Sequence, residues 1–145
     1  MFLGQYHHSF DEKFRLTIPS RFREFIAEGA VVTRGFDKNL MVLSGEAFQQ
    51  LYQHLNEMNI TDQTSRLLRR MILGYAQELE VDKSGRILIS QPLREFADLK
   101  ADTILVGLGD YFEIWAPKAW EGQETLLQDT DANSKRFSAL HLATR

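Results

Sequence analysis

The alternation of apolar and polar positions along the chain predicts a protein rich in short β-strands. Runs with a two-residue period end in clusters of Gly, Asp, Asn or Pro, which are residues that favour turns. Gly and Asp within 35–38 suit a hairpin between two neighbouring strands. The predicted strands cover residues 2–10, 15–18, 30–34, 39–43, 77–82, 86–89, 103–107 and 111–115.

Apolar residues spaced at i, i+3, i+4 and i+7 predict helices between these strands. The clearest stripe lies in 44–56, where Ser44 is the expected N-cap and the apolar side contains Phe48, Leu51, Tyr52 and Leu55. Further helices are predicted at 21–27, at about 62–76, after Pro92 and from Pro117. The polar segment from 130 onward is expected to be flexible, with a short helix at 137–144 as the alternative.

The second half of the chain repeats the plan of the first half. The stretch DEKFRLTI at 11–18 returns as DKSGRILI at 82–89, and the same offset of 71 places Arg23-Glu24-Phe25 on Arg94-Glu95-Phe96. Chance similarity between hairpins is the alternative explanation. We expect two half-domains that share one core about a pseudo-two-fold axis. The expected divisions are a first half at 1–58, a central helix at 59–76, a second half at 77–129 and a tail at 130–145.

The repeated stretch predicts a turn that enters a strand. In each copy, Asp opens the turn and an arginine begins the strand four residues later. Alternation along a strand places Leu16/Ile18 and Ile87/Ile89 on one face. Arg15 and Arg86 then lie on the opposite face, pointing away from the core if the isoleucine face is buried.

Composition narrows the possible classes of protein. A chain of 145 residues that is 43% hydrophobic has the size of one compact domain. It has no cysteine, which rules out disulfides and thiolate metal sites. No apolar run approaches a membrane helix and no signal peptide is visible, so we expect a cytoplasmic protein. The net charge of −3 argues against a protein that binds nucleic acid by bulk attraction, so any such binding needs a local patch.

The chain resembles the MraZ family. The resemblance rests on the opening Met-Phe-x-Gly, the two Asp-x-x-x-Arg stretches, the Pro-x-x-Arg-x-Glu-Phe after the first of them and the central Arg-Arg-Met-Ile-Leu-Gly, and it covers residues 1 to about 120. It implies an α+β fold whose two repeats form a pseudo-two-fold, β-barrel-like swapped-hairpin core of the AbrB type with flanking helices. It also implies a bacterial transcriptional regulator, expected to be a repressor associated with the nucleoid. Such a regulator assembles into ring-shaped homo-oligomers and binds direct repeats in its own promoter region, upstream of division and cell-wall genes.

The same resemblance implies that double-stranded DNA is contacted by Asp11/Arg15 and Asp82/Arg86. An arginine fork can bond a guanine edge or two phosphate oxygens, and a nearby aspartate can hold it in place. Lys13 and Lys83 lie on the turns and could meet phosphates. The alternative is that the aspartates only stabilise the turns and the arginines are ordinary solvated groups. The chain departs from the family pattern at Phe14, where Gly is common, so that either this turn differs in conformation or Phe14 faces a partner.

Other basic residues have a choice of roles. Arg21, Arg23 and Arg94 could frame the DNA site, or could pair with Glu24, with Glu95 or with another subunit. The cluster of Arg66, Arg69 and Arg70 on the central helix is assigned to subunit assembly before DNA.

Enzymatic and metal chemistry have little support in the sequence. The histidines lack ligand spacing, and Gly107-Leu108-Gly109 lacks the context of a phosphate loop. We expect no enzyme activity, no cofactor, no metal, no small-molecule substrate and no membrane partner. The alternative function is an oligomeric structural or protein-interaction module that does not bind DNA.

Overall fold

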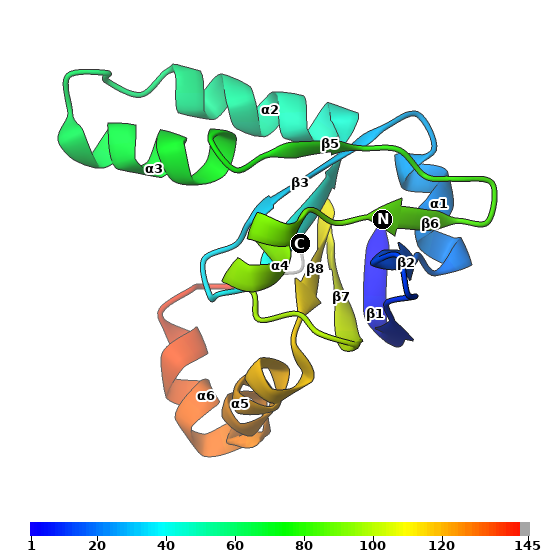
Figure 1. The fold of residues 1–145 in the computed structure, drawn as a ribbon. Helices are drawn as coiled ribbons and strands as arrows, with labels where there is room; N and C mark the ends of the chain where they lie inside the picture. Colours follow the sequence, from blue (N-terminus) through cyan, green and yellow to red (C-terminus); the bar gives the residue numbers. More distant parts are fainter. Residues whose placement is uncertain (143–145) are drawn as a thin grey trace.

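The computed structural model describes residues 1–142, which form eight strands and six helices (Figure 1). In chain order these are β1 (Phe2–Ser9), β2 (Arg15–Thr17), α1 (Ser20–Ile26), β3 (Ala30–Arg34), β4 (Leu40–Ser44), α2 (Gly45–Asn56), α3 (Gln63–Leu73), β5 (Gln77–Leu79), β6 (Arg86–Leu88), α4 (Gln91–Phe96), β7 (Asp102–Gly109), β8 (Tyr111–Trp115), α5 (Pro117–Gln128) and α6 (Thr130–Ser138).

Strands from the two halves of the chain interleave in one antiparallel sheet. Its order is β1-β7-β8-β4-β3-β5. Exchanging each strand for its counterpart in the other half (β1 for β5, β3 for β7 and β4 for β8) gives the same order read from the opposite edge, as expected for pseudo-two-fold symmetry. The first strand of each half therefore pairs in the other half, β1 with β7 and β5 with β3. The predicted α+β class with two repeats is confirmed. Within residues 1–142 the sheet is open, with β1 and β5 as its edges.

A two-stranded ribbon of β2 and β6 lies at the centre of this symmetry. Leu16 pairs with Ile87 in the middle of the ribbon, and these are the residues that the offset of 71 relates. Both motifs are thus brought onto one small antiparallel ribbon, so that the two Asp–Arg turns become neighbours.

The main core fills the space between the ribbon and the large sheet. Leu16 and Ile87 are 0% and 1% exposed and belong to one apolar cluster with Val42, Leu105 and other sheet residues. Phe22 of α1, in the first half, packs against Phe112 of β8, in the second half, with their ring centres 5.0 Å apart. The burial of these alternate positions confirms the parity expected from the sequence.

Helices cover other parts of the large sheet. Leu55 of α2 and Ile72 of α3 pack on Met41 and Leu43 of β4, and in Figure 1 the two helices project from the sheet as a hairpin. Trp120 of α5 packs on β7 and β8. The predicted cap of α2 is confirmed, since the Ser44 hydroxyl accepts a hydrogen bond from the amide of Ala47.

Two sequence predictions need correction. The strand predicted at 77–82 ends at Leu79, because its partner β3 begins at Ala30, which pairs with Leu79. The segment expected to be flexible contains α6. Asp129 caps this helix, and the Asn133 amide group donates to the carbonyls of Leu126 and Leu127. Residues 143–145 of the predicted tail lie outside the described residues.

Candidate functional site

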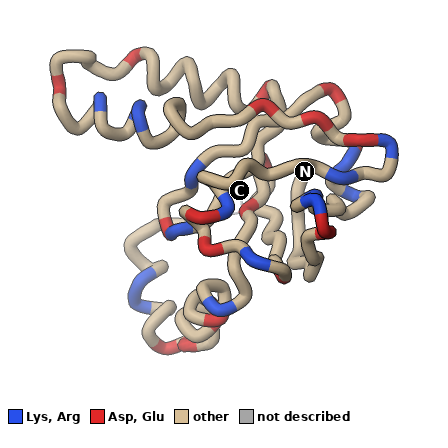
Figure 2. Tube along the Cα trace, viewed as in Figure 1, with Lys and Arg blue, Asp and Glu red and all other residues tan. Residues whose placement is uncertain are grey.

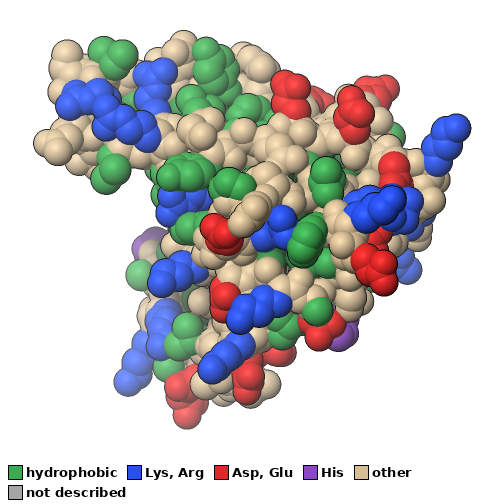
Figure 3. Space-filling view, in the orientation of Figure 1, with side chains coloured by type: hydrophobic (Ala, Val, Ile, Leu, Met, Phe, Trp, Pro, Cys, Tyr) green, Lys and Arg blue, Asp and Glu red, His purple; other side chains and the backbone are tan. Residues whose placement is uncertain are grey.

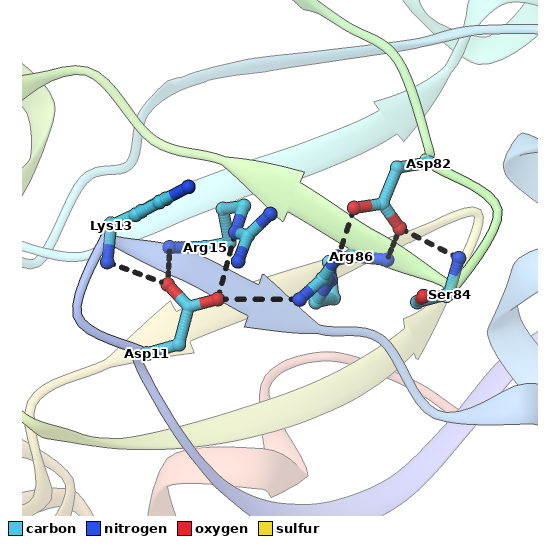
Figure 4. Close-up of polar contacts among 6 residues, drawn as sticks. All are labelled: Asp11, Lys13, Arg15, Asp82, Ser84 and Arg86. Atoms are coloured by element: carbon cyan, nitrogen blue, oxygen red, sulfur yellow. Dashed lines mark hydrogen bonds and ion pairs between the residues drawn. The ribbon is translucent and has the colours of Figure 1, made fainter.

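The two repeated turns have the same backbone design. Asp11 Oδ1 accepts hydrogen bonds from the amides of Lys13 and Arg15, both at 2.9 Å. Asp82 Oδ1 accepts the same pair of bonds from Ser84 and Arg86, also at 2.9 Å (Figure 4). These bonds are typical of Asp in turns, where the side chain replaces a backbone acceptor. Each aspartate therefore fixes the turn and the start of the strand that follows.

The fourth residue of each turn adopts a left-handed backbone. The φ angle is 60° at Phe14 and 77° at Gly85, and both amides bond the carbonyl of the aspartate three residues before them. The departure at Phe14 therefore does not change the turn conformation. A bulky residue with positive φ is strained by roughly 1–2 kcal/mol relative to Gly. Phenylalanine therefore occupies a position where glycine would fit the backbone better.

The second oxygen of each aspartate holds the arginine that follows it. Asp11 Oδ2 lies 2.7 Å from Nε of Arg15, and Asp82 Oδ2 lies 3.0 Å from Nε of Arg86. Asp11 Oδ2 also lies 3.5 Å from Nη1 of Arg86, so this carboxylate links the two turns. In both cases the backbone amide of the arginine, followed by other hydrogen bonds and its guanidinium charge, lowers the pKa of the aspartate. Both carboxylates are consequently ionised at neutral pH.

The ribbon presents its arginines on the face opposite the core. The side chains of Arg15 and Arg86 are 31% and 28% exposed to solvent. Leu16 and Ile87, which pair between them in the ribbon, are buried. The predicted site residues Asp11, Arg15, Asp82 and Arg86 are thus brought together on one exposed surface. Figure 4 shows the two Asp–Arg pairs side by side across the ribbon.

Lys13 and Lys83 are exposed at the tips of the turns. They occupy different turn positions, because Lys13 corresponds to Ser84 and Lys83 corresponds to Glu12. Each turn therefore has one lysine, placed differently with respect to its arginine. Basic and acidic residues are mixed along the chain around the ribbon (Figure 2), and blue and red side chains lie next to one another on this side of the molecule (Figure 3).

Arg23 and Arg94, two of the residues expected to frame the site or to pair with a glutamate, bond the backbone next to the ribbon instead. Their Nε groups donate to the carbonyls at the ends of the two motif strands, Ile18 at 2.8 Å and Ile89 at 3.1 Å. Neither arginine forms an ion pair with Glu24 or Glu95 within the described part of the chain. The repetition of Arg-Glu-Phe at the common offset indicated that the two arginines occupy equivalent positions, and their bonds to Ile18 and Ile89 agree with this.

Each of these arginines covers the turn of the other half. The Arg94 guanidinium stacks 3.6 Å from the centre of the Phe14 ring. The Arg23 guanidinium lies against Gly85, where an added Cβ would meet Nε and Cζ of Arg23. Glycine at this position therefore avoids the strain of a positive φ, which Phe14 has in the other turn, and leaves room for Arg23.

The remaining basic candidates lie elsewhere. Arg21 is exposed on α1, and Arg66, Arg69 and Arg70 lie on α3 in the projecting helical hairpin. Arg66 Nη1 donates to the carbonyl of Ile60 at 3.0 Å, which fixes the loop between the two helices. The three arginines of α3 lie away from the ribbon (Figure 1).

Residues 1–142 contain no group of three His, Asp or Glu residues arranged to hold a metal ion. No helix in the same part of the chain is long and apolar enough to cross a bilayer.

Comparison with known proteins gives one consistent family. The profile described as "MraZ protein, putative antitoxin-like" matches twice, at residues 1–71 and 72–140. A relative from Roseiflexus sp. (strain RS-1), named "Transcriptional regulator MraZ", is 44% identical over 95% of this chain and 94% of its own length. Relatives of the same name from Roseiflexus castenholzii and Acetivibrio thermocellus are each 42% identical, over 95% and 83% of this chain and 94% and 85% of their own lengths.

These relatives are named as regulators, in agreement with the expectation that the chain is not an enzyme. The resemblance drawn from the two motifs is confirmed by the double match over nearly the whole chain. The chain belongs to the MraZ family.

Proposed function

We propose that this protein is a transcriptional regulator that binds double-stranded DNA through its two Asp–Arg turns. The observation that carries the proposal is the pairing of Arg15 and Arg86 on one exposed face, each held by a carboxylate. The names of the relatives support regulation of transcription.

The ribbon has the dimensions and chemistry for the major groove. A two-stranded β-ribbon fits this groove, and an arginine fork matches O6 and N7 of guanine. Because Asp11 holds the Nε of Arg15, the terminal nitrogens of this guanidinium stay available for DNA. Holding the side chain in advance lowers the entropy lost on binding. Lys13 and Lys83 at the turn tips would contact phosphates.

Assembly supplies the affinity that one subunit lacks. Two arginine-bearing turns on a chain of net charge −3 give weak attraction to DNA. In a closed ring of subunits, turns from successive protomers would engage successive direct repeats, and the later contacts become intramolecular. The protein would then act as a cytoplasmic, nucleoid-associated repressor on repeats in its own promoter, upstream of division and cell-wall genes. It would need no cofactor.

Affinity is expected to rise steeply with the number of operator repeats. We expect a fragment with several repeats to bind about 100-fold or more tightly than one in which a single repeat is left intact, as multivalent binding predicts. Fluorescence anisotropy on duplexes of equal length, with the other repeats scrambled, measures this ratio. Equal affinity for one repeat and for several would refute the multivalent part of the proposal.

The Asp11→Asn substitution is expected to weaken specific binding more than Asp82→Asn. Asn keeps an oxygen for the backbone amides but places an amide group where Asp11 Oδ2 holds both Arg15 and Arg86. Asp11→Asn frees Arg15, at a cost of about 0.5–1.5 kcal/mol of ordering on binding, and also removes one of the two carboxylates that hold Arg86. In Asp82→Asn, Arg15 stays bonded to Asp11, and Arg86 keeps its contact with Asp11.

The readout for these variants is the ratio of specific to non-specific affinity. Removing a negative charge strengthens attraction to any DNA, so that the absolute affinity alone is misleading. The two variants carry the same change in charge, and each controls for this effect in the other. An equal ratio for Asp11→Asn, Asp82→Asn and wild type would show that the carboxylates do not position the arginines.

A further inference from the structure

The two ends of the ribbon have the same backbone but different surroundings for their arginines. Phe14 precedes Arg15, and Leu88 lies opposite Arg15 on the neighbouring strand. At the other end, Gly85 precedes Arg86, and Thr17 lies opposite Arg86. One arginine is therefore flanked by two large apolar side chains, and the other by a glycine and a hydroxyl.

Both apolar side chains are accessible from solvent. Phe14 is 47% exposed and Leu88 is 54% exposed, whereas Gly85 is buried beneath Arg23. Leu88 lies on the same face of β6 as Arg86, two residues away, because side chains alternate along a strand. Leu88 therefore places an apolar side chain beside Arg15 on this face, where Thr17 places a hydroxyl beside Arg86, and Phe14 lies at the same end of the ribbon, against Arg94 of α4.

The Phe14 ring is held in place. The Arg94 guanidinium stacks on it, and Arg94 is itself fixed by its bond to the carbonyl of Ile89. The left-handed φ at Phe14 sets the direction in which the ring leaves the turn. A strained residue that is held by its surroundings often marks a functional position.

We propose that Phe14 and Leu88 contact a thymine methyl group next to the base pair read by Arg15, and that no such contact forms beside Arg86. This inference rests on the proposed function. The thymine methyl is the apolar group that base edges present in the major groove, so an apolar pair beside an arginine is suited to a thymine next to a guanine. The pseudo-two-fold ribbon then binds an asymmetric site, and each protomer lies on the DNA in one orientation.

The test combines a change in the DNA with a change in the protein. Uracil in place of thymine removes the methyl group and leaves the Watson–Crick pairing intact. Wild-type protein is expected to bind its own upstream fragment about four-fold or more weakly when the fragment contains uracil, which is the size of one buried methyl group. The variant Phe14→Gly with Leu88→Thr, which copies the Arg86 end, is expected to bind both fragments equally.

Thr17→Leu is the matched control. It adds an apolar side chain beside Arg86, so its loss of affinity on uracil DNA is expected to equal or exceed that of wild type. Phe14→Gly removes backbone strain, and Leu88→Thr places a β-branched residue at an exposed strand position. Should the double variant not fold, Leu88→Thr alone carries the comparison, because Thr already occupies the corresponding position of β2.

The outcomes separate this inference from the proposed function. If wild-type protein binds the thymine fragment and Arg15→Ala weakens that binding, the proposed function is supported. Equal loss on uracil DNA in wild type and in the double variant, or no loss in either, would then overturn the thymine contact alone. If wild-type protein does not bind the fragment at all, both proposals fail.

Discussion

Replacing Arg15 and Arg86 together with alanine is expected to abolish specific DNA binding. A bidentate contact between arginine and guanine contributes about 1–3 kcal/mol, so each single variant should lose about ten-fold to 100-fold in affinity for one repeat. A ring of subunits multiplies this loss, because every protomer would lose the same contact. Anisotropy titrations of Arg15→Ala, Arg86→Ala and the double variant measure the effect.

Lys118→Ala is the control for this series. It removes the same charge from an exposed position on α5, away from the ribbon (Figure 1). We expect it to bind like wild type within a factor of about two, as for a distant charge at physiological salt. Oligomer size, measured by light scattering, should be unchanged in all four variants. A loss in Lys118→Ala as large as that in the ribbon variants would show that general charge, rather than the turns, governs binding.

Phe22→Ala is expected to lower the free energy of unfolding by about 3–5 kcal/mol, the usual cost of removing a buried phenylalanine. Phe22 is 1% exposed. The centre of its ring lies 5.1 Å, 5.2 Å and 5.0 Å from the ring centres of Phe2, Tyr6 and Phe112. Because Phe112 belongs to the second half, the resulting cavity would loosen the contact between the halves. Urea unfolding at fixed protein concentration measures the change, since assembly makes stability depend on concentration.

Phe36→Ala is the control that tests whether the loss of stability in Phe22→Ala comes from the burial of the ring. This phenylalanine is 68% exposed in the turn between β3 and β4, and its removal is expected to change stability by no more than about 0.5 kcal/mol. Similar unfolding midpoints for the two variants would contradict the assignment of Phe22 to the core between the halves.

Sequence reasoning found the features that depend on local pattern. Alternation at Leu16/Ile18 and Ile87/Ile89 predicted which face of each strand is buried, and hence where both arginines lie. Ser44 was predicted as a cap because its side chain acts on an amide three residues away. The internal repeat predicted two similar halves. The fold agrees with this, because Leu16 and Ile87, which the offset of 71 relates, pair at the centre of the ribbon.

Features that depend on contacts between the halves were not predictable from the sequence. No local sequence pattern indicates that β1 pairs with β7, about 100 residues away, or that Asp11 contacts Arg86 as well as Arg15. The stacking of Arg94 on Phe14 joins residues that no spacing rule relates. The helix α6 was missed because its sequence is polar, and its stability comes partly from the bonds of Asn133 to the end of α5.

The most direct test of the central claim is the binding of wild-type protein to the fragment upstream of its own gene, and to a scrambled fragment of equal length, over a series of salt concentrations. The account predicts tighter binding to the native fragment. It also predicts that the logarithm of the association constant falls linearly with that of salt, with a slope of about −0.9 for each phosphate contacted. Equal binding of the two fragments, or assembly with no DNA binding at any salt concentration, would contradict it and favour an oligomeric interaction module.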